Sequence, residues 1–128
     1  MTVVPCDLRL SPLNHTWVLD FDGTLVRHNG HKRGEDEWLP GALEFLRSIP
    51  EGDLVILLTA REETYRERTE AFIRAAGVRV DAVHFNVPMG ERILINDTKP
   101  SGLTCAHAVA PTRDEGLEGL RIVIDPEL

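Results

Sequence analysis

Short apolar runs alternate with longer amphipathic segments along this chain. Residues 16–20 (TWVLD) and 54–58 (LVILL) are typical of buried strands, because short runs rich in leucine and β-branched residues favour that conformation. Residues 80–85 (VDAVHF) and 92–96 (RILIN) have the same character. We expect all of these segments to be strands of one sheet.

The amphipathic segments between these runs are predicted to be helices. One helix is expected over residues 40–47, because proline is well placed in a first turn. A second is expected over residues 62–76, with Gly77 directly after its end. Residues 27–37 (RHNGHKRGEDE) are polar and contain glycine, so a loop is expected there, and residues 50–53 (PEGD) are predicted to form a turn.

The order of these elements predicts the fold class. Alternating strands and helices favour βαβ units, and therefore an α/β fold with a parallel sheet and right-handed crossovers. The tail is less regular. Residues 105–110 (CAHAVA) and 120–125 (LRIVID) are candidates for further strands, and a helix is the alternative for each.

Composition narrows the possible partners. The chain has 128 residues, which suits a single domain over residues 1–128, and 42% of them are hydrophobic. The formal net charge of -7 argues against nucleic acid or an anionic membrane surface as the main partner. A small anionic substrate is compatible with this charge, because a site can be locally positive or hold a metal ion.

The compartment is predicted from what the sequence lacks. No stretch reaches the roughly 18 apolar residues of a membrane helix. Residues 1–15 contain two prolines and no long apolar run, so no export signal is expected. Cys6 and Cys105 lie far apart without a CxxC pattern, which favours reduced thiols. These features predict a cytoplasmic protein.

Polar side chains follow three of the expected strands at their carboxyl ends. They are Asp20 and Asp22 after the first strand, Thr59 and Arg61 after the second, and Asn96, Asp97 and Lys99 after the last. In open parallel sheets, ligands bind outside the carboxyl ends of the strands, so these groups are expected to converge. Carboxylates suit Mg²⁺, which also binds substrate phosphates. Together with a hydroxyl and a lysine, this set favours phosphoryl transfer.

Three ordered segments resemble the motifs of one known superfamily. "DFDGTL" (20–25) is similar to the first motif of the haloacid dehalogenase-like hydrolases, most of which are Mg²⁺-dependent phosphatases. "LLTAR" (57–61) resembles the second motif and "ILIND" (93–97) the fourth. The resemblance implies a Rossmann-like three-layer sandwich with a mostly parallel sheet.

The resemblance implies a role for each matching residue. Asp20 would be the nucleophile that forms an aspartyl-phosphate intermediate. Asp22 would be the general acid and then the general base, and its backbone carbonyl would contact the metal. Thr59 would hold the transferring phosphoryl group. Asp97 would bind Mg²⁺ together with the carboxylate of Asp20.

The chain departs from the superfamily pattern at two places. The third motif is a lysine or arginine upstream of the fourth, yet no lysine lies between Thr59 and Asp97. We expect Lys99 to supply the charge, and Arg92 is the alternative, although it begins the expected strand. The fourth motif often has two acids, whereas here Asn96 precedes Asp97. Asp97 would therefore bear most of the metal binding.

The spacing of the motifs leaves no room for a cap domain. Capless members of the superfamily tend to act on larger or exposed phosphorylated substrates, or to cover the site with a neighbouring subunit of a homo-oligomer. Residues 27–38 are then the local candidate for substrate contact, including His28 and His31, and a solvated surface loop is the alternative. Residues 90–102 resemble small bacterial members associated with sugar phosphates. Arg61 either forms a structural ion pair or binds phosphate.

Two rival functions belong to different classes. The first is a catalytically weak or inactive module that binds a phosphorylated metabolite or a protein partner. The absent upstream lysine favours it. The second is hydrolysis of a phosphonate or a carbon–halogen bond, which the missing cap disfavours, because phosphonate cleavage in this superfamily uses a cap lysine.

Overall fold

The structure is a computed structural model, and it describes residues 6–128. The expectation of no export signal covers residues 1–15, of which 1–5 lie outside the described residues. The strands are β1 (Cys6–Leu10), β2 (Thr16–Asp20), β3 (Leu54–Leu58), β4 (Ala82–His84) and β5 (Leu120–Ile124). The α-helices are α1 (Ala42–Ser48) and α2 (Arg66–Ala75), and short 3₁₀ turns cover Gly30–Lys32 (η1) and Glu63–Tyr65 (η2).

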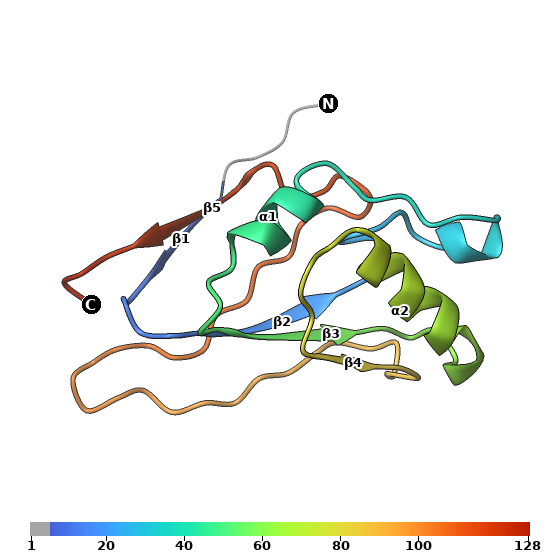
Figure 1. The fold of residues 1–128 in the computed structure, drawn as a ribbon. Helices are drawn as coiled ribbons and strands as arrows, with labels where there is room; N and C mark the ends of the chain where they lie inside the picture. The colour runs from blue at the N-terminus through green and yellow to red at the C-terminus, as the bar shows by residue number, and fades with distance from the viewer. Residues whose placement is uncertain (1–5) are drawn as a thin grey trace.

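The strands form two separate parallel sheets, which makes the fold mixed α/β (Figure 1). The larger sheet has the order β2-β3-β4, and the smaller one pairs β1 with β5. Asp20 lies opposite Leu58, and Leu58 lies opposite His84, so the carboxyl ends of β2, β3 and β4 are level. The residues that follow these strands therefore share one edge.

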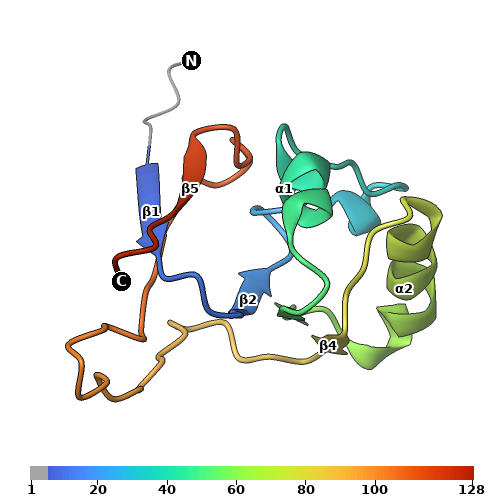
Figure 2. The same cartoon turned by 60° about the vertical axis from the view of Figure 1, so that its left-hand side comes forward.

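Both α-helices lie on the same side of the larger sheet in the two views (Figure 2). This placement follows from the connections, because successive right-handed crossovers between neighbouring parallel strands return to one face. The helix expected over residues 40–47 is confirmed as α1. The helix expected over residues 62–76 is confirmed as η2 and α2, and Gly77 follows its end with φ +70°.

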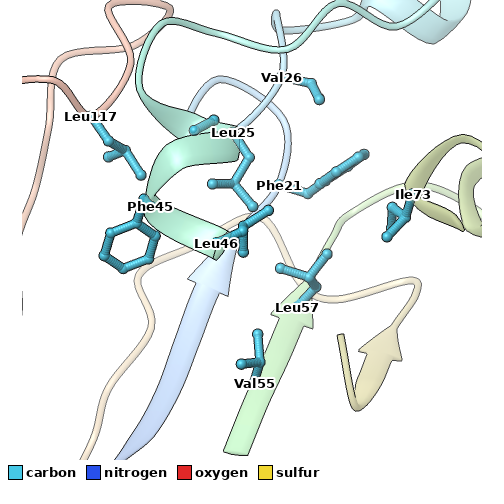
Figure 3. Packing of buried hydrophobic residues seen from close by; sticks show 10 residues of the cluster. Phe21, Leu25, Val26, Phe45, Leu46, Val55, Leu57, Ile73 and Leu117 are labelled. Atoms are coloured by element: carbon cyan, nitrogen blue, oxygen red, sulfur yellow. The ribbon is translucent and has the colours of Figure 1, made fainter. Parts of the chain in front are cut away.

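The hydrophobic core fills the space between the larger sheet and these helices (Figure 3). Val55 and Leu57 of β3 are almost fully buried and form its floor. Its buried members are Phe21, Leu25, Val26, Ala42, Phe45, Leu46, Val55, Leu57, Ile73 and Leu117. Trp17 adds an edge-to-face contact with Phe45 at 5.5 Å between ring centroids. The loop directly after β2 is thus anchored in the core through Phe21, Leu25 and Val26.

The predicted strands at 16–20, 54–58 and 80–85 are confirmed, the last one as the shorter β4. The candidate strand at 120–125 is confirmed as β5. The strand that pairs with it, β1, is not predicted, because Asp7 and Arg9 interrupt the hydrophobic pattern of this segment. Both charges are satisfied across the sheet, where Asp7 pairs with Arg121 at 2.5 Å and Arg9 with Asp125 at 3.2 Å.

The strands predicted at 92–96 and 105–110 are wrong, since neither segment has strand structure. The physical reason is that neither segment lies beside a described strand with which its backbone could pair. The side chains of Ile93, Leu94 and Ile95 are 82%, 61% and 91% exposed. In Figure 1 the orange stretch runs away from the carboxyl ends of β2 and β3 and turns beyond their starts.

An apolar groove separates the two sheets. It has a volume of about 890 Å³ and lies between β2 and α1 on one side and β5 on the other. Trp17 and Phe45 line one wall, and Leu120, Ile122 and Ile124 line the other. The free edge of β2 therefore faces an apolar space rather than a partner strand. No helix within residues 6–128 has the length and apolar character needed to cross a membrane.

Candidate active site

Asp20 is the last residue of β2 and stands at the carboxyl edge of the larger sheet. Gly23 turns the chain away directly afterwards, with φ +87°, a left-handed conformation that disfavours other residues. The Thr24 hydroxyl then donates a 2.9 Å hydrogen bond to Oδ2 of Asp20. The sequence Asp-Phe-Asp-Gly-Thr thus builds a tight loop that fixes one oxygen of the Asp20 carboxylate.

The carboxylate of Asp20 combines partial burial with access to solvent. Its side chain is 38% exposed, and its Oδ1 lies 3.5 Å from Nη2 of Arg92. Burial raises the pKa of Asp20 above its ordinary value, against the lowering effects of the Thr24 hydrogen bond and the Arg92 charge. Asp22 raises the pKa of Asp20 further. The carboxylate is therefore open to a ligand and more basic than a free aspartate.

Asp22 is held by groups from the end of β3. The Thr59 hydroxyl donates to Oδ2 of Asp22 at 3.0 Å, and the Arg61 guanidinium reaches Oδ1 at 2.8 Å through Nη2. Arg61 Nε lies 3.1 Å from both oxygens of Asp22. The convergence of Asp22 and Thr59, expected from the strand ends, is thus present in the structure.

Arg61 also binds a second carboxylate, which comes from the loop before α1. Its Nη2 lies 2.6 Å from Oδ1 of Asp36, and its Nη1 donates to Oδ2 of Asp36 at 3.0 Å. Nη1 donates to the Thr69 hydroxyl of α2 at 2.9 Å as well. Burial opposes the charged form of Arg61, but the hydrogen bonds to Asp36 and Asp22 prevail and raise its pKa. The guanidinium remains a fixed positive charge between two carboxylates.

His31 lies against the same cluster. Its side chain is 4% exposed, and its Nδ1 stands 3.8 Å from Oδ1 of Asp22. That nitrogen is buried and has no hydrogen-bond partner among the described residues. The ring packs edge-on against Tyr65 at 4.6 Å between centroids. Burial and the nearby Arg61 charge lower the pKa of His31 below its ordinary value.

The loop over residues 27–38 is tied to the rest of the molecule at several points. Arg68 of α2 donates to the backbone carbonyls of His31 and Gly34. The carboxylate of Asp114, from the tail, accepts the His28 backbone N–H at 2.8 Å. Of the two histidines considered for substrate contact, His31 is buried and His28 is half-buried. The segment is thus held in place by these hydrogen bonds, while residues 27, 32–35 and 37 remain exposed.

Asp97 and Lys99 do not join Asp20 and Asp22 in the structure. Both residues are exposed, and no ion pair or side-chain hydrogen bond links either of them to the site within residues 6–128. The Asp97 carboxylate accepts a hydrogen bond from its neighbour Asn96, whose Nδ2 lies 3.4 Å from its Oδ1. The Lys99 backbone belongs to a turn closed by hydrogen bonds with Leu103 and Gly102.

Some residues of the cluster are not found by reasoning from strand ends. Asp36 and Thr24 are not predicted as site residues, and Arg92 is considered only as an alternative to Lys99. Thr24 carries a signal, since a hydroxyl four residues after Asp20 can reach back across a glycine turn. Asp36 has none, because its position depends on the long-range contact with Arg61.

The chain was compared with protein-family models, with curated proteins and with solved structures. None of these comparisons gives a significant match.

Proposed function

We propose that the chain is a Mg²⁺-dependent phosphatase of the haloacid dehalogenase-like type, which hydrolyses a phosphomonoester through an aspartyl-phosphate on Asp20. The observation that carries the proposal is the position of Asp20. It ends a parallel strand with an accessible carboxylate, and the Asp22–Thr59–Arg61 cluster lies beside it. This is the edge where open α/β sheets bind ligands.

Asp20 has the features of a nucleophile for phosphoryl transfer. An oxygen of its carboxylate attacks phosphorus, the bond from phosphorus to the leaving-group oxygen breaks, and an acyl phosphate forms. Water then attacks the same phosphorus, which releases inorganic phosphate and restores the carboxylate. The raised pKa of Asp20 supports this role, because a more basic carboxylate is a better nucleophile once ionised.

Asp22 would donate a proton to the leaving group and then take one from the attacking water. Its contacts with Arg61 and Thr59 fix the orientation of its carboxylate beside Asp20. A substrate phosphoryl group beside Arg61 would also attract the guanidinium. This attraction would weaken the contact between Arg61 and Asp22.

Mg²⁺ would be held by the carboxylates of Asp20 and Asp97 and by the backbone carbonyl of Asp22. These donors fit the ion, which prefers oxygen ligands and keeps several waters. When bound, the ion would offset the charge of the substrate phosphate. The fit requires residues 92–97 to move, because Asp97 does not reach Asp20 in the structure.

The structure offers a place for that segment. The exposed apolar side chains of 92–96 match the apolar groove between β2 and β5, and the facing edge of β2 has no partner strand. A parallel strand in this groove would bury Ile93 or Ile95 and would join the two sheets into one. It would also bring Asp97 to the edge that holds Asp20. The result would be the mostly parallel, Rossmann-like sheet expected from the sequence, and the chain after Asp97 would supply the third layer.

The connection is long enough for this rearrangement. Residues 85–91 reach roughly 23 Å when fully extended. Crossing beneath β4, β3 and β2 takes roughly 14 Å sideways, and returning along the strands takes roughly 13 Å, which combine to roughly 19 Å. The chain can therefore reach the amino end of the groove without unfolding β4.

The same movement exchanges the cation beside Asp20. Arg92 contacts Asp20 in the structure, but as the first residue of the new strand it would leave for the opposite edge. Lys99 follows Asp97 by two residues and would arrive with it. We therefore propose Lys99, rather than Arg92, as the residue that offsets the phosphate charge during turnover.

The proposed substrate is a small phosphorylated molecule such as a sugar phosphate. The chain has no cap domain to select it, so residues 27–38 or a neighbouring subunit of a homo-oligomer would cover the site. The net charge of -7 disfavours nucleic acid and anionic membranes as partners. Cys6 and Cys105 are both free, which is compatible with the cytoplasmic setting that we propose.

Phosphate release from p-nitrophenyl phosphate and from a panel of sugar phosphates tests this proposal. We expect Mg²⁺-dependent release by the natural chain and none by Asp20→Asn. Asp7→Asn is a matched control, because Asp7 is an exposed residue of the smaller sheet, where it pairs with Arg121. Undiminished release by Asp20→Asn, or full activity in a chelator, would contradict the proposal.

A non-catalytic module is the second candidate, and one observation favours it. Asp97 and Lys99 stand away from Asp20, so the proposed metal ligand and cation are not in place for hydrolysis, and the site would then only bind a phosphorylated ligand. A stable beryllium fluoride adduct on Asp20, without turnover of any substrate in the panel, would support this function over the phosphatase.

A further inference from the structure

The side chains of Asp22 and His31 lie close together without a hydrogen bond between them. Nδ1 of His31 and Oδ1 of Asp22 are 3.8 Å apart, which is too long for a hydrogen bond. The imidazole nitrogen is nevertheless buried and has no other partner within the described residues. A buried polar atom without a partner is rare in folded proteins and calls for an explanation such as a bound ion.

A third ligand lies at the same place. Oxygen atoms of Asp22 and Asp36 and a ring nitrogen of His31 all fall within 4.8 Å of one another. Ligands of one metal ion are separated by about 3–4 Å, since each lies about 2.0–2.2 Å from the metal. The three side chains thus need only small shifts to share one ion.

We propose that the side chains of Asp22, His31 and Asp36 bind a divalent transition-metal ion of the Zn²⁺ class. The proposed Mg²⁺ site uses other side chains, those of Asp20 and Asp97, and shares only residue Asp22, through its backbone carbonyl. One imidazole nitrogen and two carboxylates suit Zn²⁺, whereas Mg²⁺ prefers oxygen ligands alone. Three protein ligands leave a fourth position for water.

The net charge of the cluster formed by Arg61, Asp22 and Asp36 favours binding of a cation. Arg61 offsets one of the two carboxylate charges, so Asp22 and Asp36 keep a formal excess of one negative charge. A carboxylate offers about four acceptor positions, and Asp36 uses two of them, both for Arg61. Asp22 accepts from Thr59 and from Nε and Nη2 of Arg61, with Nε shared between its two oxygens, so the ion would replace part of that shared contact. A dication can therefore bind the same carboxylates from the side of His31.

The fold holds His31 ready for this role. The residue lies in η1, its ring packs against Tyr65, and its backbone carbonyl accepts a hydrogen bond from Arg68. An orientation fixed before binding reduces the entropy that binding costs. Bound Zn²⁺ would also engage Asp22, which the proposed hydrolysis needs free. We therefore expect Zn²⁺ to lower Mg²⁺-dependent phosphate release.

Calorimetric titration of the chelator-treated chain with zinc chloride tests the site without any substrate. We expect one site, and a loss of affinity of about tenfold or more in His31→Gln and in Asp36→Asn. His107→Gln is the matched control, because His107 is an exposed tail histidine. Asp20→Asn should also bind Zn²⁺ normally. Undiminished binding by His31→Gln, or no binding by the natural chain, would overturn the proposal.

A second measurement covers variants that do not fold. Zinc added to the natural chain should shift the imidazole nitrogen resonances of His31 in an NMR spectrum and leave those of His107 in place. Shifts confined to other histidines would overturn the site. Because both experiments measure binding, a failed zinc site leaves the phosphatase proposal untouched. Conversely, a chain that binds zinc but releases no phosphate would support the zinc site and contradict the phosphatase proposal.

Discussion

Arg61 donates hydrogen bonds to the carboxylate of Asp22 through two nitrogen atoms, with Nη2 at 2.8 Å and Nε at 3.1 Å from Oδ1. The same guanidinium binds Asp36, and its side chain is 2% exposed. The guanidinium therefore couples the end of β3 to the loop before α1 and sets the orientation of the proposed general acid.

Replacing Arg61 by methionine should destabilise the fold strongly. The change leaves Asp22 and Asp36 buried without their cation, and breaking a buried ion pair in this way costs about 3–5 kcal/mol. Chemical denaturation measures the loss in free energy of unfolding. Arg121→Met is the control, because its pair with Asp7 is exposed, and its effect should be small. Equal losses in the two variants would contradict a structural role for Arg61.

Asp81 should make stability depend on pH. The Val55 N–H donates to its carboxylate at 2.7 Å and Arg79 does so at 2.6 Å, and these contacts lower the pKa of Asp81 from 3.8. A carboxyl whose pKa is lowered on folding contributes stability above its unfolded pKa and loses it as the pH falls through the folded value.

The Asp81→Asn variant tests this dependence. We expect it to melt a few degrees below the natural chain at pH 7, with the gap closing under acid conditions below the ordinary pKa of 3.8. Thermal unfolding followed by circular dichroism at several pH values measures both. Glu51→Gln, at an exposed turn position, should follow the natural chain throughout. A gap that stays constant with pH would refute the assignment to the carboxylate.

Residues 92–96 should become protected when the proposed site is filled. If the segment pairs with the free edge of β2, its backbone N–H groups gain hydrogen bonds and exchange more slowly. Hydrogen exchange read by mass spectrometry, with and without Mg²⁺ and beryllium fluoride, measures the change. We expect slower exchange of 92–96 with both present, and no change in Asp97→Asn. Fast exchange in every condition would show that the segment stays unpaired.

Lys99 and Arg92 should differ in their contribution to turnover. If Lys99 offsets the phosphate charge, Lys99→Ala should lower kcat by about a hundredfold, as the loss of one stabilising donor typically does. Arg92→Ala should change kcat little, because the proposed pairing of residues 92–96 with β2 would take Arg92 away from the site. Steady-state kinetics with p-nitrophenyl phosphate measures both. The reverse order of effects would assign the role to Arg92.

The sequence predicts the strands of the larger sheet well, because β2 and β3 are short apolar runs whose type does not depend on distant contacts. It fails at 92–96 for the opposite reason. The run of Ile93, Leu94 and Ile95 has the composition of a strand, but composition does not decide whether the segment lies beside a strand edge, and in the structure it does not pair with the free edge of β2. β1 is missed because Asp7 and Arg9 interrupt its pattern, and only their pairing with β5 makes them favourable.

The candidate site shows the same division. Asp20, Asp22 and Thr59 are predictable, because they follow strands whose carboxyl ends must be level in a parallel sheet. Asp36 is not, and His31 is considered only for substrate contact, because both lie in a loop whose path is fixed by Arg61 and Arg68. Local patterns identify residues at strand ends, whereas residues from loops require the long-range contacts of the folded chain.

The central claim is a covalent phosphoryl group on Asp20, and trapping it tests the claim most directly. Borohydride reduces an acyl phosphate to an alcohol, so treatment during turnover with Mg²⁺ should convert Asp20 to homoserine. Mass analysis of the peptide that contains residues 17–26 detects the change. We predict homoserine at position 20 in the natural chain and none without substrate. Phosphate release with an unmodified Asp20, or with the reduced product at another residue, would contradict a covalent intermediate on Asp20.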